Sequence, residues 1–180
     1  MGNVNNNSAG LNDIENLIFK AFEETKEESC KFPKGHENSS VKWITKTIKE
    51  RVGEIGRTNK FEVASTNHGG EWHYDLTWYK NNEAGYLEKV VLALESELSV
   101  RNPKGLNDFE KLLVSNADNK VWICFAKGNF NYPKNVNELI EKFDSSVNSY
   151  VNLTSGSRVL ILIWEDYMEG KIHPHLIVKQ

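Results

Sequence analysis

Apolar residues recur at helical spacing in two stretches near the start of the chain. Residues 11–30 carry one stripe, with acidic residues between its members: Leu11, Ile14, Leu17, Ile18, Ala21 and Phe22. Residues 41–55 carry a second stripe: Val41, Ile44, Ile48, Val52 and Ile55. Positions three and four apart share one face of a helix, so both stretches predict amphipathic helices. The stretch between them contains Pro33, Gly35 and an Asn-Ser-Ser sequence, which predicts a loop.

Strand-like and helical patterns alternate through the rest of the chain. Strands are predicted at residues 60–64, 71–79, 89–98, 120–126, 157–164 and 171–178, and helices at 106–117 and 136–151. A three-strand meander followed by a helix, a strand and another helix favours a sheet with strands in both directions. The expected fold class is therefore α/β, with a mixed central β-sheet flanked by α-helices on both faces.

Length and composition fit one globular domain. The chain has 180 residues, of which 39% are hydrophobic and 26% are charged, and a chain of this size can bury a core without disulfides or metal. We expect a single domain from residue 11 to residue 180, after a disordered tail at residues 1–10. The net charge of −3 gives no overall attraction to nucleic acid, so such a partner needs a local basic surface. The helix at 41–55 and its exit supply the basic residues for one, unless they form only a solvated face: Lys42, Lys46, Lys49, Arg51, Arg57 and Lys60.

Cysteines and apolar runs indicate the compartment. Cys30 and Cys124 are far apart in sequence and have no zinc-type spacing, so we expect two buried, reduced thiols. The polar first ten residues lack the apolar segment of a secretion signal. The longest apolar run, residues 159–164, is too short to span a bilayer. These features predict a cytoplasmic protein that does not associate with membranes.

The predicted strand at 71–79 has two chemically different sides. One side is aromatic and aliphatic: Trp72, Tyr74, Leu76 and Trp78. The other is polar: His73, Asp75 and Thr77. Successive strand residues point to opposite faces of a sheet. Asp75 should therefore point away from the apolar side of its strand.

Two carboxylates end the next strand. The run Val-Val-Leu-Ala-Leu at 90–94 is typical of a strand buried on both faces, and Glu95 and Glu97 follow it. Residues two apart share a face, so like charges lie side by side at the end of a buried strand. A divalent cation such as Mg²⁺ would compensate them, because hard ions prefer carboxylate oxygen. If the two strands form a hairpin, Asp75 can approach Glu95; the alternative is that all three acids face solvent.

This arrangement resembles the restriction-endonuclease-like, PD-(D/E)XK nuclease superfamily. Its core has the order α-β-β-β-α-β, with an Asp on one strand and a (D/E)-x-K motif on the next. The chain is similar to a branch that has Glu-x-Glu in place of that motif, followed by a helix beginning Asp-Phe-x-Lys-Leu-Leu; here the residues are LALESELS and then DFEKLL at 108–113. The resemblance covers about residues 41–126 and lacks the Pro that often precedes the first Asp, where Tyr74 stands.

The resemblance implies a metal-dependent phosphodiesterase site. Asp75 and Glu95 would be ligands of Mg²⁺ or Mn²⁺, Glu97 would replace the usual lysine, and Lys111 would supply the positive charge from the helix. A helical wheel places Lys111 roughly opposite the apolar residues Phe109, Leu112 and Leu113, facing water, unless its long side chain reaches back to the strand end. Lys104, in the loop before that helix, is the second candidate.

Three functions remain open at this point. The first is a nuclease that hydrolyses phosphodiester bonds in nucleic acid, with DNA as the expected substrate; members of this fold often form homodimers to cut both strands. The second is a catalytically inactive module of the same fold that binds nucleic acid or protein in a defence or repair complex. The third is a small-molecule-binding domain, which an apolar pocket far from the acids would favour. His173 and His175 suggest a metal only weakly, since no third ligand is near, and a strand-edge role is the expectation.

Overall fold

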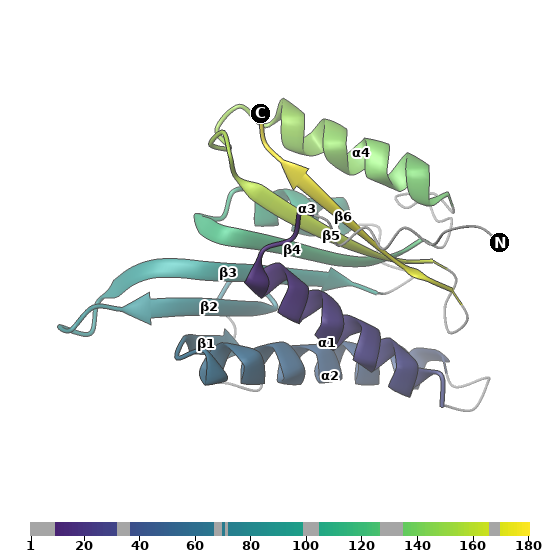
Figure 1. The fold of residues 1–180 in the computed structure, drawn as a ribbon, viewed down its shortest axis with the longest axis horizontal. Coiled ribbons are helices and arrows are strands. Elements are labelled where there is room, and N and C mark those ends of the chain that lie inside the picture. Colours follow the sequence, from purple (N-terminus) through teal and green to yellow (C-terminus); the bar gives the residue numbers. More distant parts are fainter. Residues whose placement is uncertain are drawn as a thin grey trace.

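The structure is a computed structural model, and it describes residues 10–31, 37–66, 70, 72–98, 105–126, 135–165 and 170–180. The helices are α1 (Asp13–Ser29), α2 (Glu37–Thr58), α3 (Gly105–Leu113) and α4 (Val136–Ser149). The strands are β1 (Glu62–Ser65), β2 (Leu76–Asn81), β3 (Leu87–Glu97), β4 (Ala117–Ala126), β5 (Arg158–Glu165) and β6 (Ile172–Val178). Figure 1 shows the helices and strands in one body, with the long β2–β3 hairpin extending to one side.

The six strands form one mixed sheet in sequence order, from β1 to β6. The first three strands pair antiparallel, β3 to β5 pair parallel, and β6 returns antiparallel to β5. Parallel pairing requires long crossovers, and α3 and α4 provide them. The α/β class and the mixed sheet flanked by helices, as predicted from the sequence, are confirmed.

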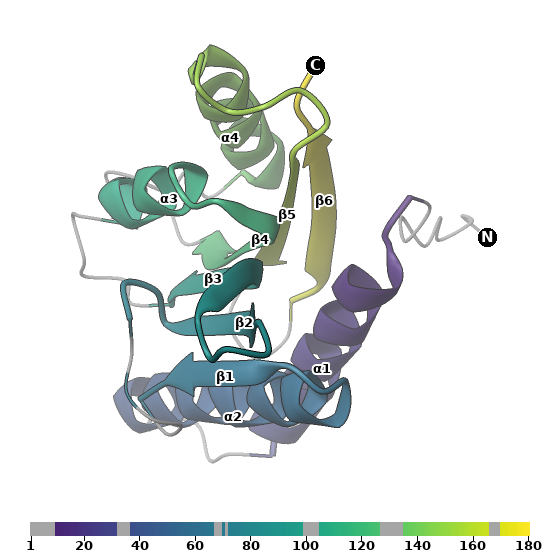
Figure 2. The same ribbon diagram turned by 90° about the vertical axis from the view of Figure 1, so that its left-hand side faces the viewer.

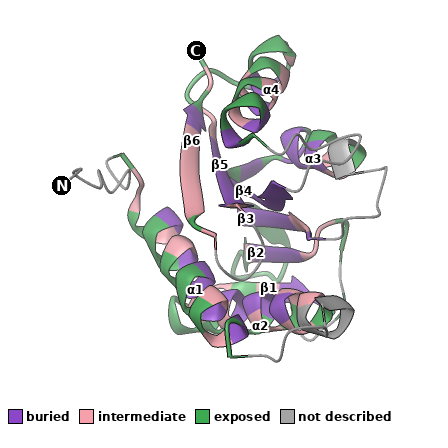
Figure 3. Cartoon of the chain, turned by 90° about the vertical axis from the view of Figure 1, so that its right-hand side faces the viewer, coloured by how far each residue is buried: buried purple, intermediate pink, exposed green. Residues whose placement is uncertain are grey.

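The helices cover the two faces of the sheet in pairs (Figure 2). On one face Phe22 of α1 and Ile48 of α2 pack in a core with Leu94 of β3. On the other face Phe109 of α3 and Phe143 of α4 pack in a second core with Ala93 and neighbouring residues. Residues 159–164 in β5 lie between the cores and are fully buried, as predicted for this strand. Figure 3 shows the central strands buried and the edge strand β6 only partly covered.

Local interactions fix the two N-terminal helices on the sheet. Asn12 and Glu15 form a capping box, in which each side chain accepts a hydrogen bond from the other residue's backbone N–H, and this starts α1. Glu15 also pairs with Arg158 at 2.6 Å, which ties α1 to β5. On α2, a Cβ atom at Gly56 would lie 2.5 Å from Nε1 of Trp78. Glycine at this position therefore allows α2 to lie directly on the indole ring.

Some sequence-based boundaries were wrong. β2 begins at Leu76 instead of residue 71, because its partner β1 ends at Ser65, which pairs with Leu76. Trp72 and Tyr74 precede the strand and do not continue the face of Leu76: Tyr74 packs with the α3–α4 core, whereas Leu76 is in the α1–α2 core. The alternation of large apolar residues is therefore typical of a strand, although Trp72 and Tyr74 have no partner strand here.

Two further expectations need correction. Residues 37–40, predicted as loop, form the first turn of α2, where polar residues such as Asn and Ser are well tolerated. Cys30 is exposed at the end of α1, so only Cys124 is the buried thiol that was expected. Among the described helices, none is long and apolar enough to cross a membrane. Residues 1–9 of the expected tail lie outside the described residues.

Candidate active site at the end of β3

Glu95 is a buried carboxylate at the carboxyl end of β3. It alternates with Ala93 along the strand and therefore faces α3, and its Cα partner in β4 is Trp122. Only 5% of the residue is exposed to solvent. A carboxylate in this position needs a compensating charge to remain ionised.

Lys111 provides that charge. Its Nζ atom lies 2.5 Å from Oε1 of Glu95 and 3.6 Å from Oδ1 of Asp108, and 37% of its side chain is exposed. The ammonium group also lies 5.8 Å from the centre of the Tyr74 ring, within the range of a cation–π contact. Of the two orientations left open for Lys111, the structure has the second: Phe109 is buried against the sheet as expected, and the long lysine side chain reaches around to the strand end. Lys104 lies outside the described residues.

The side chain of Asp75 binds the carboxyl end of β3. Its Oδ2 atom accepts hydrogen bonds from the backbone N–H of Ser96 at 2.9 Å and from the Ser96 hydroxyl at 2.7 Å. β2 begins one residue later, with Leu76 paired to Leu94, so Asp75 takes the place of a strand partner for the end of β3. Its other oxygen, Oδ1, lies 2.9 Å from Nζ of Lys49 on α2.

The acids and the lysine are electrostatically coupled. Burial raises the pKa of Glu95 to about 7, and the charges of Asp75 and Asp108 raise it too, whereas the hydrogen bond and charge of Lys111 oppose the shift. Burial tends to lower the pKa of Lys111, but the Glu95 carboxylate and the two other acids outweigh it, so this pKa is raised. Burial also raises the pKa of Tyr74. Glu95 therefore exchanges its proton near neutral pH, and Lys111 stays charged.

The chemistry of Asp75 and Glu95 fits a divalent cation. Both offer carboxylate oxygen, the ligand that Mg²⁺ and Mn²⁺ prefer, and the charge of Asp75 raises the pKa of Glu95. A bound cation would compensate the charge of Glu95, which its buried position disfavours.

Glu97 is two residues further along β3, beside Cys124 of β4, and it lies on the side of Glu95 by alternation. Within the parts of the chain that the structure describes, no three His, Cys, Asp or Glu side chains are grouped to hold a metal ion. A shared metal site of Asp75, Glu95 and Glu97 therefore stays a prediction.

A groove runs from the end of β3 along α2. Its volume is about 350 Å³, and its lining includes Lys42, Lys46 and Lys49 of α2 together with Ser96 and Glu97. This is the part of the predicted basic surface that borders the candidate site. Positive charges of α2 have acidic partners both in the groove, where Lys46 pairs with Glu50 and Lys49 with Asp75, and beyond it.

No protein-family model, curated protein or solved structure matches this chain. What the protein does must therefore be inferred from the side chains at the end of β3.

His173 and His175 make contacts at the edge of the sheet. His173 hydrogen-bonds Glu165 at 2.8 Å and His175 hydrogen-bonds Asp144 at 3.1 Å, so both histidines serve contacts at the edge strand β6.

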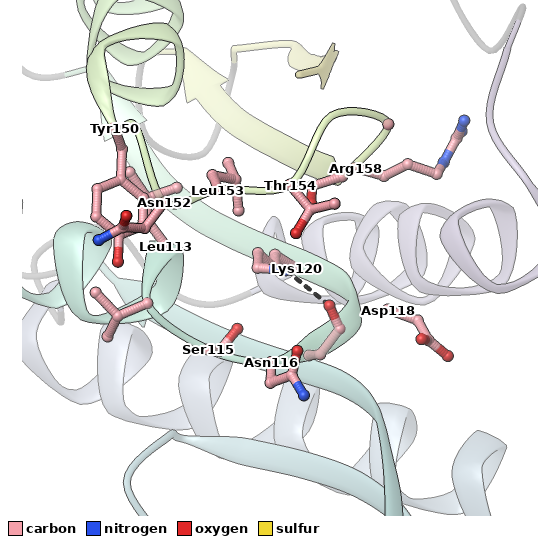
Figure 4. A pocket seen from close by; sticks show the side chains of 14 residues that line it. Leu113, Ser115, Asn116, Asp118, Lys120, Tyr150, Asn152, Leu153, Thr154 and Arg158 are labelled. Carbon is pink, nitrogen blue, oxygen red and sulfur yellow. Dashed lines mark hydrogen bonds between the residues drawn. The ribbon is translucent and has the colours of Figure 1, made fainter. Parts of the chain in front are cut away.

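A cavity of about 420 Å³ lies at the amino ends of β4 and β5, far from Glu95 along the sheet (Figure 4). Polar residues dominate the side chains that line it, among them Ser115, Asn116, Asn152, Thr154 and Lys120. This is not the apolar pocket that would favour a small-molecule-binding domain.

Sequence reasoning missed the inward role of Lys49. It was grouped with the surface residues of a basic helix, but it is buried between Asp75 and the hydroxyl of Thr66, which its Nζ contacts at 3.3 Å. The spacing contained a sign of this: Lys49 follows Ile48 and precedes Val52 by three residues, so it borders the apolar stripe. The sequence contained no such sign that Ser96 would bind Asp75.

Proposed function

We propose that this protein is a divalent-metal-dependent nuclease of the restriction-endonuclease-like superfamily that hydrolyses phosphodiester bonds in nucleic acid, with DNA as the expected substrate. The observation that carries the proposal is the contact between Lys111 of α3 and Glu95 of β3, with Asp75 bound to the next residue of that strand, Ser96. The resemblance requires a lysine from this helix at this acid, whereas simple periodicity argued against one. The order α2-β1-β2-β3-α3-β4 also supports the proposal, since it follows the α-β-β-β-α-β order of that superfamily.

Each residue has a defined part in this proposal. Asp75 and Glu95 hold the cation, Mg²⁺ or Mn²⁺, which when bound supplies an activated water and stabilises charge on the phosphate. Lys111 is the mobile charge: with 37% of its side chain exposed, it can move from Glu95 to a phosphate oxygen and stabilise the negative charge that develops there. Lys49 holds Asp75 in place from the opposite side of the sheet. Hydrolysis joins a water oxygen to phosphorus and breaks one ester P–O bond, whose oxygen leaves with a proton.

A cleavage assay tests the proposal. Single- and double-stranded DNA and RNA are incubated with the protein in Mg²⁺, in Mn²⁺ and in a chelator. Cleavage of DNA is expected only with metal, and Glu95→Ala should lower its rate by about a hundredfold or more, because the metal provides most of the catalysis. Asp118→Ala is the matched control, since Asp118 is also paired with a lysine, Lys89, at 2.7 Å, but lies at the amino end of β4. Cleavage that persists in chelator, or in Glu95→Ala, would contradict the mechanism. The expected homodimer is tested separately, by light scattering of the purified protein.

One observation favours a second function, the catalytically inactive module. Both oxygens of Asp75 already have partners, Lys49 and Ser96, and a cation would have to displace or share them. In that case the chain binds nucleic acid or protein without cutting. Nucleic-acid binding with no cleavage under any metal condition, and no effect of Mg²⁺ on thermal unfolding, would decide for this function.

A further inference from the structure

An exposed aromatic pair lies near the candidate site. The rings of Trp72 and Tyr79 have their centres 4.3 Å apart with an angle of 34° between their planes. Trp72 is 46% exposed, which is unusual for the largest apolar side chain. Tyr79 pairs with Val90 of β3, which packs with the α3–α4 core, so both rings belong to the face of the sheet that carries Glu95.

The chain connects this pair directly to the acids and the lysine. Trp72, Tyr74 and Asp75 belong to one short segment before β2. Tyr79 lies four residues beyond Asp75, which is about 13 Å along an extended strand. Tyr74 stands between Trp72 and Asp75 in sequence, and the centre of its ring lies 5.8 Å from Nζ of Lys111. An aromatic surface, a cation and the Glu95 carboxylate therefore follow one another on the same side of β2 and β3, and Asp75 binds the end of β3 through Ser96.

This face of β2 lies to one side of the covering helices. α3 packs on β3 and β4 and α4 packs on β6, whereas Trp72 contacts β2. A solvent-facing indole that is fixed against a second ring offers a flat, rigid surface. Such surfaces bind unpaired bases by stacking, and they do so with little regard to sequence. A duplex presents only grooves and backbone, because its base faces are covered by neighbouring pairs.

We propose that Trp72, supported by Tyr79, is a stacking platform for an unpaired base, and that the substrate of this site is single-stranded nucleic acid. The proposal rests on the proposed function and specifies its substrate class. Lys111 would bind the backbone phosphate next to the acids while the base of a nearby nucleotide stacks on Trp72. A protein partner fits less well, since the exposed aromatic surface is small and is bordered by a charged lysine.

Fluorescence anisotropy in chelating buffer, at one low salt concentration, tests the proposal without cleavage. Labelled single-stranded DNA and RNA oligonucleotides and the duplex of the same sequence are titrated with wild-type protein, Trp72→Ala, Trp72→Phe and Tyr86→Ala. Tyr86 is the matched control, an aromatic residue that is 72% exposed at the β2–β3 turn. Single strands should bind more tightly than duplex. Trp72→Ala should weaken single-strand binding about tenfold, as expected for loss of one base–aromatic stack.

Trp72→Phe and Tyr86→Ala show whether the loss of binding in Trp72→Ala comes from the ring at this position. Trp72→Phe keeps a ring and should retain most of the affinity, and Tyr86→Ala should bind as the wild type does. Equal binding of duplex, an equal effect of Trp72→Ala and Tyr86→Ala, or a dimer that depends on Trp72 would overturn the platform. If Glu95-dependent cleavage occurs with any of these results, the nuclease stands and only the single-strand preference fails. If no nucleic acid binds and none is cleaved, both proposals fail.

Discussion

Two buried charges lie on the same face of the sheet, at opposite ends of its parallel strands. Glu95 is at the carboxyl end of β3, and Lys120 is at the amino end of β4, beside Ala93 of β3. Lys120 is only 3% exposed, and its Nζ donates a hydrogen bond to the carbonyl oxygen of Ala117 at 2.7 Å (Figure 4). Burial lowers the pKa of Lys120, and the charge of Asp118 opposes the shift. Burial raises the pKa of Glu95, so both sites disfavour the charged form.

The two sites differ in what surrounds the buried charge. Lys120 contacts a backbone carbonyl near the ends of α3 and α4, where helix carbonyls favour a cation, and this is a structural arrangement. Glu95 contacts a partly exposed lysine and is coupled to two other acids, so its charge depends on groups that can move or bind a cation. Ligands of open α/β sheets also bind outside the carboxyl ends of the strands. If the proposed function is right, burial alone does not mark a functional group, and coupling to partly exposed, titratable partners does.

The largest expected effect is on stability as a function of pH, and its sign should differ between the two sites. The native state holds the Glu95 proton more tightly than the unfolded state, so Glu95 lowers the free energy of unfolding as pH rises from about 4.5 to about 7. Glu95→Gln should remove this loss and raise stability at pH 8 by up to about 3 kcal/mol relative to wild type. Lys120 should do the reverse: stability should rise as pH approaches its ordinary pKa of 10.5, and Lys120→Met should remove that rise.

Urea unfolding at a series of pH values measures both slopes. Glu97→Gln is the control for Glu95, because it removes the same charge two residues further along β3. An identical change of slope in Glu97→Gln would show that the pH dependence does not come from Glu95. The stability gain of Glu95→Gln over wild type should be larger at pH 8 than at pH 5. An equal gain at both pH values would contradict the description of Glu95 as a buried, poorly compensated acid.

An intermediate effect is expected from Lys111, the partner that distinguishes the Glu95 site. Lys111→Met removes the group that lowers the pKa of Glu95, so this pKa should rise above 7 and the acidic limb of the pH–rate profile should move to higher pH. The cleavage rate at pH 8 should fall about tenfold or more, because one electrostatic contact with the phosphate is lost. NMR titration of ¹³C-labelled carboxylates measures the pKa directly. Lys89→Met, which removes the exposed partner of Asp118, should leave both the pKa of Glu95 and the rate unchanged, and an equal effect of the two variants would refute the role of Lys111.

The sequence predicted the order of elements because hydrophobic periodicity reflects burial directly. Leu94 pairs with Leu76, as the expected hairpin between the strands of Asp75 and Glu95 requires, and residues 159–164 are buried on both faces. Periodicity failed at Trp72 and Tyr74, where the large side chains pack outside the ladder. Whether a strand continues depends on a partner strand, and the end of β1 at Ser65 cannot be read from the residues around Trp72.

Side-chain reach limited the prediction of the site. Glu95 and Asp75 were predicted from their phase on adjacent strands, a property of the backbone, although Asp75 lies one residue before β2. The position of Lys111 stayed open and Lys49 was grouped with a basic surface, because sequence spacing gives the direction of the Cβ atom and ignores the length of the side chain beyond it. Only the resemblance pointed to Lys111, whereas the position of Lys49 beside the apolar stripe was a weak sign of the contact with Asp75 that the structure has.

The smallest effect is expected from Lys120→Met, which tests whether the amino end of the sheet is merely structural. Methionine nearly matches the length of lysine, so the packing is kept, while the hydrogen bond to Ala117 and the buried charge are both lost. Loss of that hydrogen bond costs about 1 kcal/mol, and removal of a buried charge offsets it, so the free energy of unfolding at pH 7 should stay within about 1 kcal/mol of wild type. Nucleic-acid binding and cleavage should not change. Lys120→Ala, which also removes the side-chain stem, should be less stable than Lys120→Met by about 1 kcal/mol or more. A Lys120→Met protein that folds normally but no longer binds or cleaves nucleic acid would place function at both ends of the parallel strands, and the distinction between a structural and a reactive buried charge would then be wrong.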